Sequence, residues 1–291
     1  MNNRRSFLKN VVLATSASVI LPDFLAAATS NIAGLQLYSL REQLPHDVKA
    51  TISRVARAGY KEVETFGFNP KTGYWGLSVK EFRDLLDANG LYTPSGHYGI
   101  NEYFSNGNTD ELSAYIKVAH ALGQQYIIVP SLREEFIRTK DDFKRVAGKM
   151  NTAGELLKKE GLKLAYHNHN FEWAKSDGTT FYETLLTETD PKLLFMEMDI
   201  YWVVRAGQDP IEIFNNNPGR FRLVHIKDMD KVNPNLNTEA GNGSIDFKSI
   251  IPRAKAAGVK HFILEQENYT NIDPFVSLTK SAAYIKNVLK V

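Results

Sequence analysis

Cysteine is absent from the 291 residues of the sequence. Its absence excludes disulfide bonds, thiolate nucleophiles and zinc sites with cysteine ligands. A metal ion in this protein must therefore be held by the side chains of histidine, aspartate and glutamate.

The sequence also lacks a strong excess of either charge. Its formal net charge is +2, and no run of lysine or arginine occurs beyond the N-terminus. A nucleic-acid partner, which requires a basic patch, is therefore not expected. The hydrophobic share of 43% and the charged share of 23% are typical of a globular protein.

A long hydrophobic run is missing as well, and this decides the interpretation of residues 1–28. Arg4-Arg5 is followed by a short apolar run, 11–22, and by the small residues Ala26-Ala27-Ala28. These are the three parts of a removable export signal. The apolar run is too short and too rich in serine and threonine to span a bilayer, which takes about 20 apolar residues. The arginine pair resembles a twin-arginine (Tat) signal, so we expect the Tat machinery to export the folded protein to the periplasm.

Residues 30–291 contain no low-complexity linker and are expected to form one domain. Apolar, β-rich segments that alternate with amphipathic segments predict eight strands, at 32–40, 60–67, 91–99, 125–132, 162–170, 193–202, 222–228 and 261–268. This alternation, at a spacing of roughly thirty residues, predicts an α/β protein with a single (β/α)8 TIM barrel. A doubly wound open sheet is the alternative, but the G-x-G-x-x-G turn of its dinucleotide-binding form is absent.

Local signals mark the ends of the predicted helices. Ser78 and Thr180 each precede a glutamate by three residues, which is the pattern of a capping box. Proline follows Asp209 and Asp273, where it can occupy the first position of a helix. Glycines stand just before four predicted strands and are expected to close the preceding helices: Gly59, Gly90, Gly161 and Gly258.

Ionisable residues concentrate at the carboxyl ends of the predicted strands. They are Glu64, His97, His167, His169, Asp199, His225, Lys227, Glu265 and Glu267. In a TIM barrel, catalytic side chains come from this end of the strands. The polar residues are therefore expected to gather at one rim of the barrel.

Four of these residues, on consecutive predicted strands, suit a metal site: His167, Asp199, His225 and Glu265. A single histidine in a strand is more often a hydrogen-bonded core residue, and a single carboxylate often caps a helix. Burying two imidazoles and two carboxylates together without a counter-ion costs several kcal/mol or more. A divalent cation removes this cost, because its charge balances the two carboxylates. We therefore expect these side chains to hold a metal ion.

Several segments, in this order and at this spacing, resemble one protein family. They are GLQLYSLR, GYKEVETFG, ALGQQYIIVP, MEMDIYW, LVHIKD, GNGSIDFKSI and FILEQE, spread over most of residues 30–291. The chain resembles the xylose isomerase-like TIM barrels, the sugar phosphate isomerase/epimerase superfamily. This superfamily includes ketose 3-epimerases, hydroxypyruvate isomerase and inosose dehydratase.

The resemblance implies one divalent metal ion, commonly Mn²⁺, held by Glu, Asp, His and Glu from strands five to eight. The last three positions fall on Asp199, His225 and Glu265, but the first glutamate position falls on His167. The acid–base pair of two glutamates used by the 3-epimerases is therefore reduced to Glu265. Histidine ligands also suit Co²⁺, Fe²⁺ or Zn²⁺.

The remaining polar residues have functional and structural interpretations. Lys227 either stabilises an enolate or forms a salt bridge to Glu197 or Glu267. His169 is expected to shuttle a proton or to bind substrate, and Glu172 to be a solvated charge in a loop. Substrate contacts are expected from Glu64, His97, Trp202 and Glu267. The alternative is support of another site residue for Glu64, packing at the rim for His97 and packing in the core for Trp202.

The resemblance implies a metal-dependent isomerase or epimerase that acts on a keto-sugar through an enediolate, with Glu265 as the base. The first alternative is a dehydratase or lyase that uses the same site on inosose or on a 3-keto-glycoside. Export and the missing glutamate favour this alternative. The second alternative is an exported sugar-binding barrel without catalysis. No glycine-rich phosphate cradle is present, so the carbohydrate is expected to carry little charge. Relatives often form dimers or tetramers, so a homo-oligomer is also expected.

Overall fold

The structure is a computed structural model that describes residues 32–291. The predicted Tat signal, residues 1–28, lies outside these residues. In the described part of the chain, no helix is long and apolar enough to cross a membrane.

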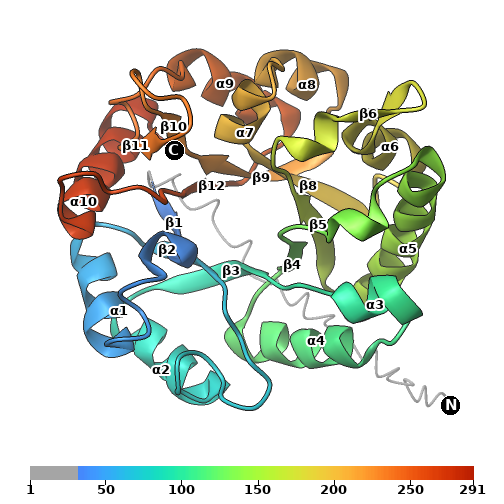
Figure 1. Cartoon of the computed structure of the whole chain (residues 1–291). Helices are drawn as coiled ribbons and strands as arrows, with labels where there is room; N and C mark the ends of the chain where they lie inside the picture. The colour runs from blue at the N-terminus through green and yellow to red at the C-terminus, as the bar shows by residue number, and fades with distance from the viewer. Residues whose placement is uncertain (1–31) are drawn as a thin grey trace, which may run out of the picture. The chain divides into compact units, whose positions relative to one another are not determined.

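Eight parallel strands close into a barrel, which confirms the predicted (β/α)8 fold (Figure 1). Each predicted strand is present but shorter than its apolar segment. The strands are β1 (Gly34–Gln36), β2 (Glu62–Thr65), β3 (Tyr92–His97), β4 (Tyr126–Val129), β5 (Lys163–His167), β8 (Leu194–Asp199), β9 (Phe221–Ile226) and β12 (His261–Leu264). The barrel closes where β1 pairs with both β2 and β12.

A ring of helices surrounds the barrel (Figure 1). They are α1 (Val48–Arg57), α2 (Val79–Ala88), α4 (Asp110–Leu122), α5 (Lys140–Lys159), α6 (Phe181–Glu188), α8 (Pro210–Asn216), α9 (Phe247–Ala257) and α10 (Pro274–Tyr284), which continues into the short π-helix η4 (Ile285–Leu289). The capping boxes predicted at Ser78 and Thr180 are confirmed, and Thr139 forms a third with Asp142. Pro210 and Pro274 each begin a helix. The four predicted closing glycines all adopt positive φ angles.

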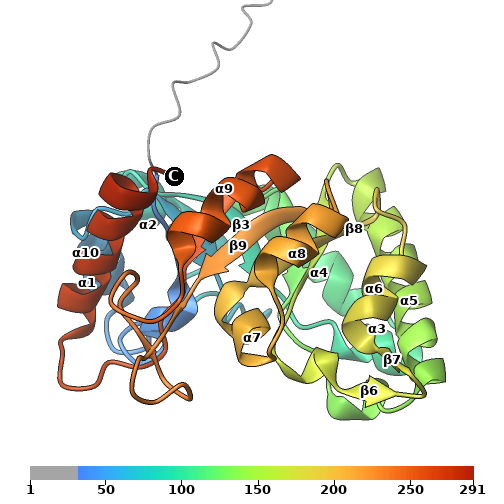
Figure 2. The same cartoon turned by 90° about the horizontal axis from the view of Figure 1, so that it is seen from above.

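Short helices and hairpins lie in the loops between the barrel strands and the outer helices. They are η1 (Leu37–Leu40), α3 (Asn101–Asn106), η2 (Glu134–Phe136), η3 (Phe171–Trp173), α7 (Ile200–Arg205) and the hairpins β6–β7 (Lys175–Ser176, Thr179–Thr180) and β10–β11 (Asp228–Met229, Asn237–Thr238). All of them follow a barrel strand and precede the next outer helix. In the side view, α7 and the β6–β7 hairpin lie at the same end of the barrel (Figure 2). The loops after the strands therefore build up one end, where a TIM barrel carries its site.

The hydrophobic core consists of two parts. The larger part packs the outer faces of the strands against the helices. The smaller part is a buried cluster of strand residues: Tyr126, Ile128, Ala165, Leu223 and Ile263. His167, His225 and Glu265 each follow a member of this cluster by two residues, so they share its face of the strand. One apolar layer inside the barrel thus supports a layer of ionisable side chains.

Two glycines of α5 provide a test of the packing between helix and barrel. A Cβ atom at Gly154 would lie 2.5 Å from the carbonyl oxygen of Leu193, whereas one at Gly148 would meet nothing within 4 Å. Gly154→Ala is expected to destabilise the protein by about 1–3 kcal/mol through overpacking. Gly148→Ala, the control in the same helix, should stabilise it by about 0.5–1 kcal/mol. Urea unfolding measures both, and equal effects of the two substitutions would contradict the close packing at Gly154.

Candidate active site

The pairing of neighbouring strands places the ionisable side chains side by side. His167 on β5 lies opposite Glu197 on β8, and Asp199 on β8 lies opposite His225 on β9. All four side chains are buried. The convergence of polar side chains that the sequence predicted is therefore present at the carboxyl ends of the strands.

The four predicted metal ligands meet at one point. Ligand atoms of His167, Asp199, His225 and Glu265, the Asp199 set, all lie within 4.8 Å of one another. Nδ1 of His225 is 3.3 Å from Oε2 of Glu265 and 3.9 Å from Oδ2 of Asp199. Oδ1 of Asp199 accepts a hydrogen bond from the backbone N–H of Trp202 and caps α7, whereas its buried Oδ2 has no hydrogen-bond partner. Within residues 32–291 this oxygen has only the longer ion-pair contacts with His225 and with Nζ of Lys227, at 3.6 Å, and the mixed imidazole and carboxylate donors around it suit a divalent cation.

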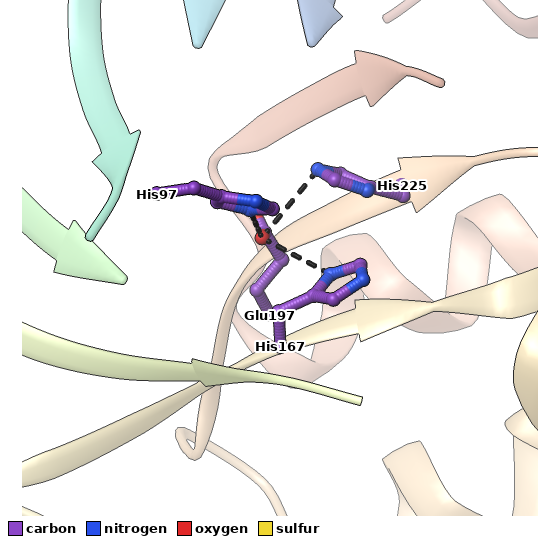
Figure 3. Close-up of side chains that lie close together, drawn as sticks. All are labelled: His97, His167, Glu197 and His225. Atoms are coloured by element: carbon purple, nitrogen blue, oxygen red, sulfur yellow. Dashed lines mark hydrogen bonds and ion pairs between the residues drawn. The ribbon is translucent and has the colours of Figure 1, made fainter. Parts of the chain in front are cut away.

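A second group of side chains shares two histidines with the first. Its ligand atoms, from His97, His167, Glu197 and His225, also lie within 4.8 Å of one another and form the Glu197 set (Figure 3). Sequence reasoning considered Glu197 only as a salt-bridge partner of Lys227. The available signal was that Glu197 precedes Asp199 by two residues and therefore shares its face of the strand.

Glu64 lies against the Glu197 set. Its Oε1 is 2.9 Å from Nε2 of His225 and 3.0 Å from Nε2 of His97. Gln36 and Ser95 donate hydrogen bonds to its two oxygens. Glu64 is completely buried and is not among the residues that line the pocket. Its position suits orientation of the two histidine rings.

Lys227 is a fully buried ammonium group. Its Nζ is 3.0 Å from Oε2 of Glu265 and 3.6 Å from Oδ2 of Asp199, and it donates a hydrogen bond to Glu267. The salt bridge to Glu267 that the sequence suggested is thus present, and no contact to Glu197 accompanies it among the described ion pairs. Lys227 is not among the residues that line the pocket, whereas its partners Glu265 and Glu267 are.

A pocket of about 500 Å³ opens above these groups. The predicted site residues that line it are His97, His167, His169, Trp202, Glu265 and Glu267. Tyr38 and Phe66, which sequence reasoning missed, add aromatic rings to its wall. No lysine or arginine occurs among the lining residues.

Glu172 fixes the loop that carries His169. It is completely buried, which corrects the prediction of a solvated charge. Its carboxylate accepts hydrogen bonds from the backbone N–H of His169 at 2.9 Å and from the hydroxyl of Tyr166 at 2.9 Å. The ring of His169 lies against Phe171 and Trp202, with centroid distances of 5.6 and 5.5 Å. Nothing in the sequence distinguishes Glu172 from an exposed loop residue.

The close contact between carboxylates and imidazoles lowers the pKa values of Glu64 and Glu197 and raises that of His97. Burial opposes ionisation of Glu64 and Glu197, but contact with the histidines outweighs it. The pKa of Glu64 is well below its usual value, and that of Glu197 falls to about 2. Burial also opposes protonation of His97, but Glu64 and Glu197 raise its pKa to about 9. Burial opposes protonation of His225 as well, but Glu197 and Glu265 hold its pKa well above normal, whereas burial holds the pKa of His167 well below normal. Without a metal ion, the two carboxylates are therefore expected to pair with imidazolium at His97 and His225, with His167 neutral.

The residues nearer the pocket differ from one another. Burial raises the pKa of Asp199 to about 7 in spite of Lys227. Burial also tends to raise the pKa of Glu265, but Lys227 and His225 outweigh burial and hold this pKa well below normal. Burial and then Lys227 lower the pKa of His169 to about 4. Glu265 is thus an ionised carboxylate at the pocket, and His169 is a neutral imidazole that can donate or accept a hydrogen bond.

The eight-stranded barrel, with carboxylates and imidazoles gathered at the carboxyl ends of its strands, defines a (β/α)8 barrel with the arrangement of an enzyme site. The family model "Xylose isomerase-like TIM barrel" matches residues 52–288. The chain belongs to this family.

Individual relatives cover most of the chain. Inosose dehydratase from Lacticaseibacillus casei is 24% identical over an alignment of 275 positions that covers 82% of this chain and 89% of that protein. The crystal structure of a sugar phosphate isomerase/epimerase from Parabacteroides distasonis is 31% identical, with a TM-score of 0.79, and the match covers 93% of this chain and 99% of the other. The IOLI protein with a bound zinc atom shares the fold at 13% identity and a TM-score of 0.69, over 87% and 97% of the two chains.

The buried carboxylate of Glu172 provides a test that depends on pH. Burial raises its pKa to about 7 in the folded protein. The folded state therefore binds this proton more strongly than the unfolded state, and stability is lost as the pH rises through 7. Glu172→Gln removes this loss and retains a hydrogen-bond acceptor. Its stability relative to the wild type is expected to increase by about 1–3 kcal/mol between pH 5 and pH 8.

Thermal and urea unfolding at a series of pH values measure this difference. Glu188→Gln, which removes a carboxylate from the exposed face of α6, controls for the change in net charge. A stability difference for Glu172→Gln that stays constant from pH 5 to pH 8 would show that this carboxylate is not desolvated.

Proposed function

We propose that the protein is a carbohydrate lyase of the dehydratase type. It removes a proton next to a ketone and expels the oxygen substituent on the following carbon. The observation that carries this proposal is the placement of Glu265. Its carboxylate lines the pocket, and the buried Nζ of Lys227 lies 3.0 Å from its Oε2. The curated relative named inosose dehydratase, which aligns over most of both chains, supports the same reaction class.

The pocket suits a sugar or cyclic polyol without phosphate groups. Its wall carries the aromatic rings of Tyr38, Phe66 and Trp202, which can lie against the apolar face of a sugar ring. The side chains of Trp202 and His169 line the pocket, and among the described residues Nε1 of Trp202 and Nδ1 of His169 have no hydrogen-bond partner, so a small rotation of either ring would offer a polar atom to a substrate hydroxyl group. The lack of lysine and arginine among the lining residues favours an uncharged carbohydrate over a phosphosugar.

The proposed reaction begins at Glu265. The carboxylate accepts the proton from the carbon next to the ketone, and the electron pair of the C–H bond moves toward the carbonyl oxygen. Lys227 holds Glu265 in position and adds positive potential to the pocket where negative charge develops. When the carbonyl forms again, the bond to the oxygen on the β-carbon breaks. The protonated Glu265 returns its proton to this oxygen, with His169 as a hydrogen-bond donor. The products are an α,β-unsaturated ketone and water, or a free sugar when the leaving oxygen is glycosidic.

We also propose that the Asp199 set holds a divalent metal ion. When bound, the ion supplies Lewis-acid polarisation of the ketone oxygen. Oδ2 of Asp199, which accepts no hydrogen bond from the described residues, and the mixed nitrogen and oxygen donors support this assignment. Mn²⁺ is the metal we favour, and Co²⁺, Fe²⁺ or Zn²⁺ suit the same donors. Zinc is the metal named for the IOLI protein, which shares the fold.

An isomerase or epimerase is the second candidate. It shares the first step, but the enolate is reprotonated at carbon and no substituent leaves. The solved relative described as a sugar phosphate isomerase/epimerase, at 31% identity, favours this outcome. The two reactions differ in their products, because elimination alone creates a conjugated ketone that absorbs ultraviolet light.

The role of Glu265 is tested by Glu265→Gln. This substitution removes the proposed base and is expected to lower kcat by about 10²–10⁴-fold. Glu267→Gln is the matched control, because Glu267 also pairs with Lys227 and lines the pocket. It should lower kcat much less than Glu265→Gln does. The assay follows ultraviolet absorbance and uptake of solvent deuterium during incubation of inosose or a 3-keto-glycoside with the metal-loaded protein.

The outcomes separate the candidates. Absorbance that rises with turnover supports the lyase, and deuterium uptake without absorbance supports the isomerase. Substrate binding without either signal would overturn both and favour a sugar-binding barrel. Equal losses from Glu265→Gln and Glu267→Gln would contradict Glu265 as the base.

We further propose that residues 1–28 direct export through the Tat pathway. In a bacterium that contains the Tat machinery, the full chain should accumulate in the periplasm with Thr29 as its first residue. Replacing Arg4-Arg5 with two lysines should hold the uncleaved chain in the cytoplasm. Immunoblots of the two fractions, with mass spectrometry of the mature N-terminus, measure this. Unchanged export of the lysine variant would exclude a twin-arginine signal.

A further inference from the structure

Three imidazole nitrogens converge on one carboxylate oxygen in the Glu197 set (Figure 3). Oε2 of Glu197 lies 2.9 Å from Nε2 of His97, 3.3 Å from Nδ1 of His167 and 3.4 Å from Nε2 of His225. The four side chains come from β3, β5, β8 and β9. Four separate strands therefore aim nitrogen and oxygen donors at the same small volume.

Hydrogen bonds alone do not satisfy these atoms. Among the described residues, Oε1 of Glu197 is buried and has no hydrogen-bond partner, and the only polar contact of the buried Nδ1 of His167 is the one at 3.3 Å with Oε2 of Glu197. Nε2 of His97 and Nε2 of His225 each face both Glu197 and Glu64, although one ring nitrogen can donate only one proton. Buried polar atoms without partners are uncommon, and an unplaced ion is one of their recognised causes.

The spacing of the donors is that of a coordination shell. Zinc lies about 2.0–2.2 Å from histidine nitrogen and carboxylate oxygen, which places neighbouring ligand atoms about 3–3.5 Å apart. The distances from Oε2 of Glu197 to the three nitrogens run from 2.9 to 3.4 Å. Three histidines and one carboxylate are also a donor set that Zn²⁺ and Co²⁺ accept.

The distribution of charge points to the same place. Lys227 contacts the carboxylates of Asp199 and Glu265. Within residues 32–291, the recorded ion pairs of Glu64 and Glu197 are all with histidines. The two buried carboxylates on this side thus lack a permanently charged partner, and a divalent cation would balance them.

We propose that the Glu197 set binds a divalent cation of its own, Zn²⁺ or a similar ion. This ion is separate from the one proposed for the Asp199 set. The two sets use opposite edges of the His225 ring. Nε2 faces Glu197 and Glu64, and Nδ1 faces Glu265 and Asp199. An ion in the Glu197 set fixes the rings of His97 and His167, which form part of the pocket wall. This inference concerns metal content and does not depend on the proposed reaction.

The test is cobalt binding by the mature protein, residues 29–291, after removal of bound metal with a chelator. Elemental analysis gives the number of ions, and titration followed by the visible spectrum of Co²⁺ gives affinity and ligand environment. His97→Asn removes a ligand of the Glu197 set only, and Asp199→Asn, the matched variant, removes a ligand of the Asp199 set only. His97→Asn is expected to weaken binding of one ion at least 100-fold. Asp199→Asn should retain that ion with its spectrum.

Three results would overturn the proposal. The first is wild-type affinity and spectrum in His97→Asn, the second is a wild-type protein that binds no ion, and the third is an Asp199→Asn variant that binds no ion. The second or third result would mean that protons on the histidines balance the negative charge of the Glu197 set. Circular dichroism and thermal unfolding verify that each variant is folded. If His97→Asn does not fold, Glu197→Gln, which has the same shape, replaces it with the same expectations.

Discussion

The compensation of buried negative charge is the constraint on which the centre of this barrel depends. Glu64, Glu197 and Asp199 are completely buried, and Glu265 is only 5% exposed. Removing an ionised carboxylate from water costs several kcal/mol unless a partner compensates it. The protein compensates the two pairs of carboxylates differently. Lys227 forms ion pairs with Asp199 and Glu265, whereas the recorded ion pairs of Glu64 and Glu197 are with histidines. A permanent cation therefore sits beside the proposed base, and exchangeable protons or a metal ion sit on the other side.

Much of this arrangement follows from the regularity of the barrel, and that part could be predicted from the sequence. Segments between helix caps located all eight strands, because strands buried on both faces tend to be near-continuous apolar runs, as several of these are. Side chains two residues apart share a face, so a late histidine and a late carboxylate on adjacent strands had to converge. The meeting of His167, Asp199, His225 and Glu265 is the direct result.

The parts that could not be predicted depend on depth and on contacts across the barrel. Glu64 and Glu265 look alike in the sequence, but Glu64 is sealed by Gln36 and Ser95, whereas Glu265 reaches the pocket. The sequence did not show that Glu197 contacts histidines and not Lys227, because only the closed barrel brings the histidines of β3, β5 and β9 around it. The side chain of Glu172 turns inward from a loop, and loops have no periodicity from which its burial could be inferred.

The family resemblance led us to expect glutamate at position 167, and the neighbours of this position favour the histidine that is present. Nδ1 of His167 lies 3.3 Å from Glu197, and the other carboxylates of the centre are close by. A glutamate here would place a fifth carboxylate in the buried cluster, next to one that has no lysine or arginine partner. At such short range, with little water to screen them, the like charges would repel one another. An imidazole avoids this repulsion and still offers a nitrogen on either edge of its ring. The charge of Glu197 and Glu64 thus favours histidine at position 167, and this histidine belongs to both sets of ligands.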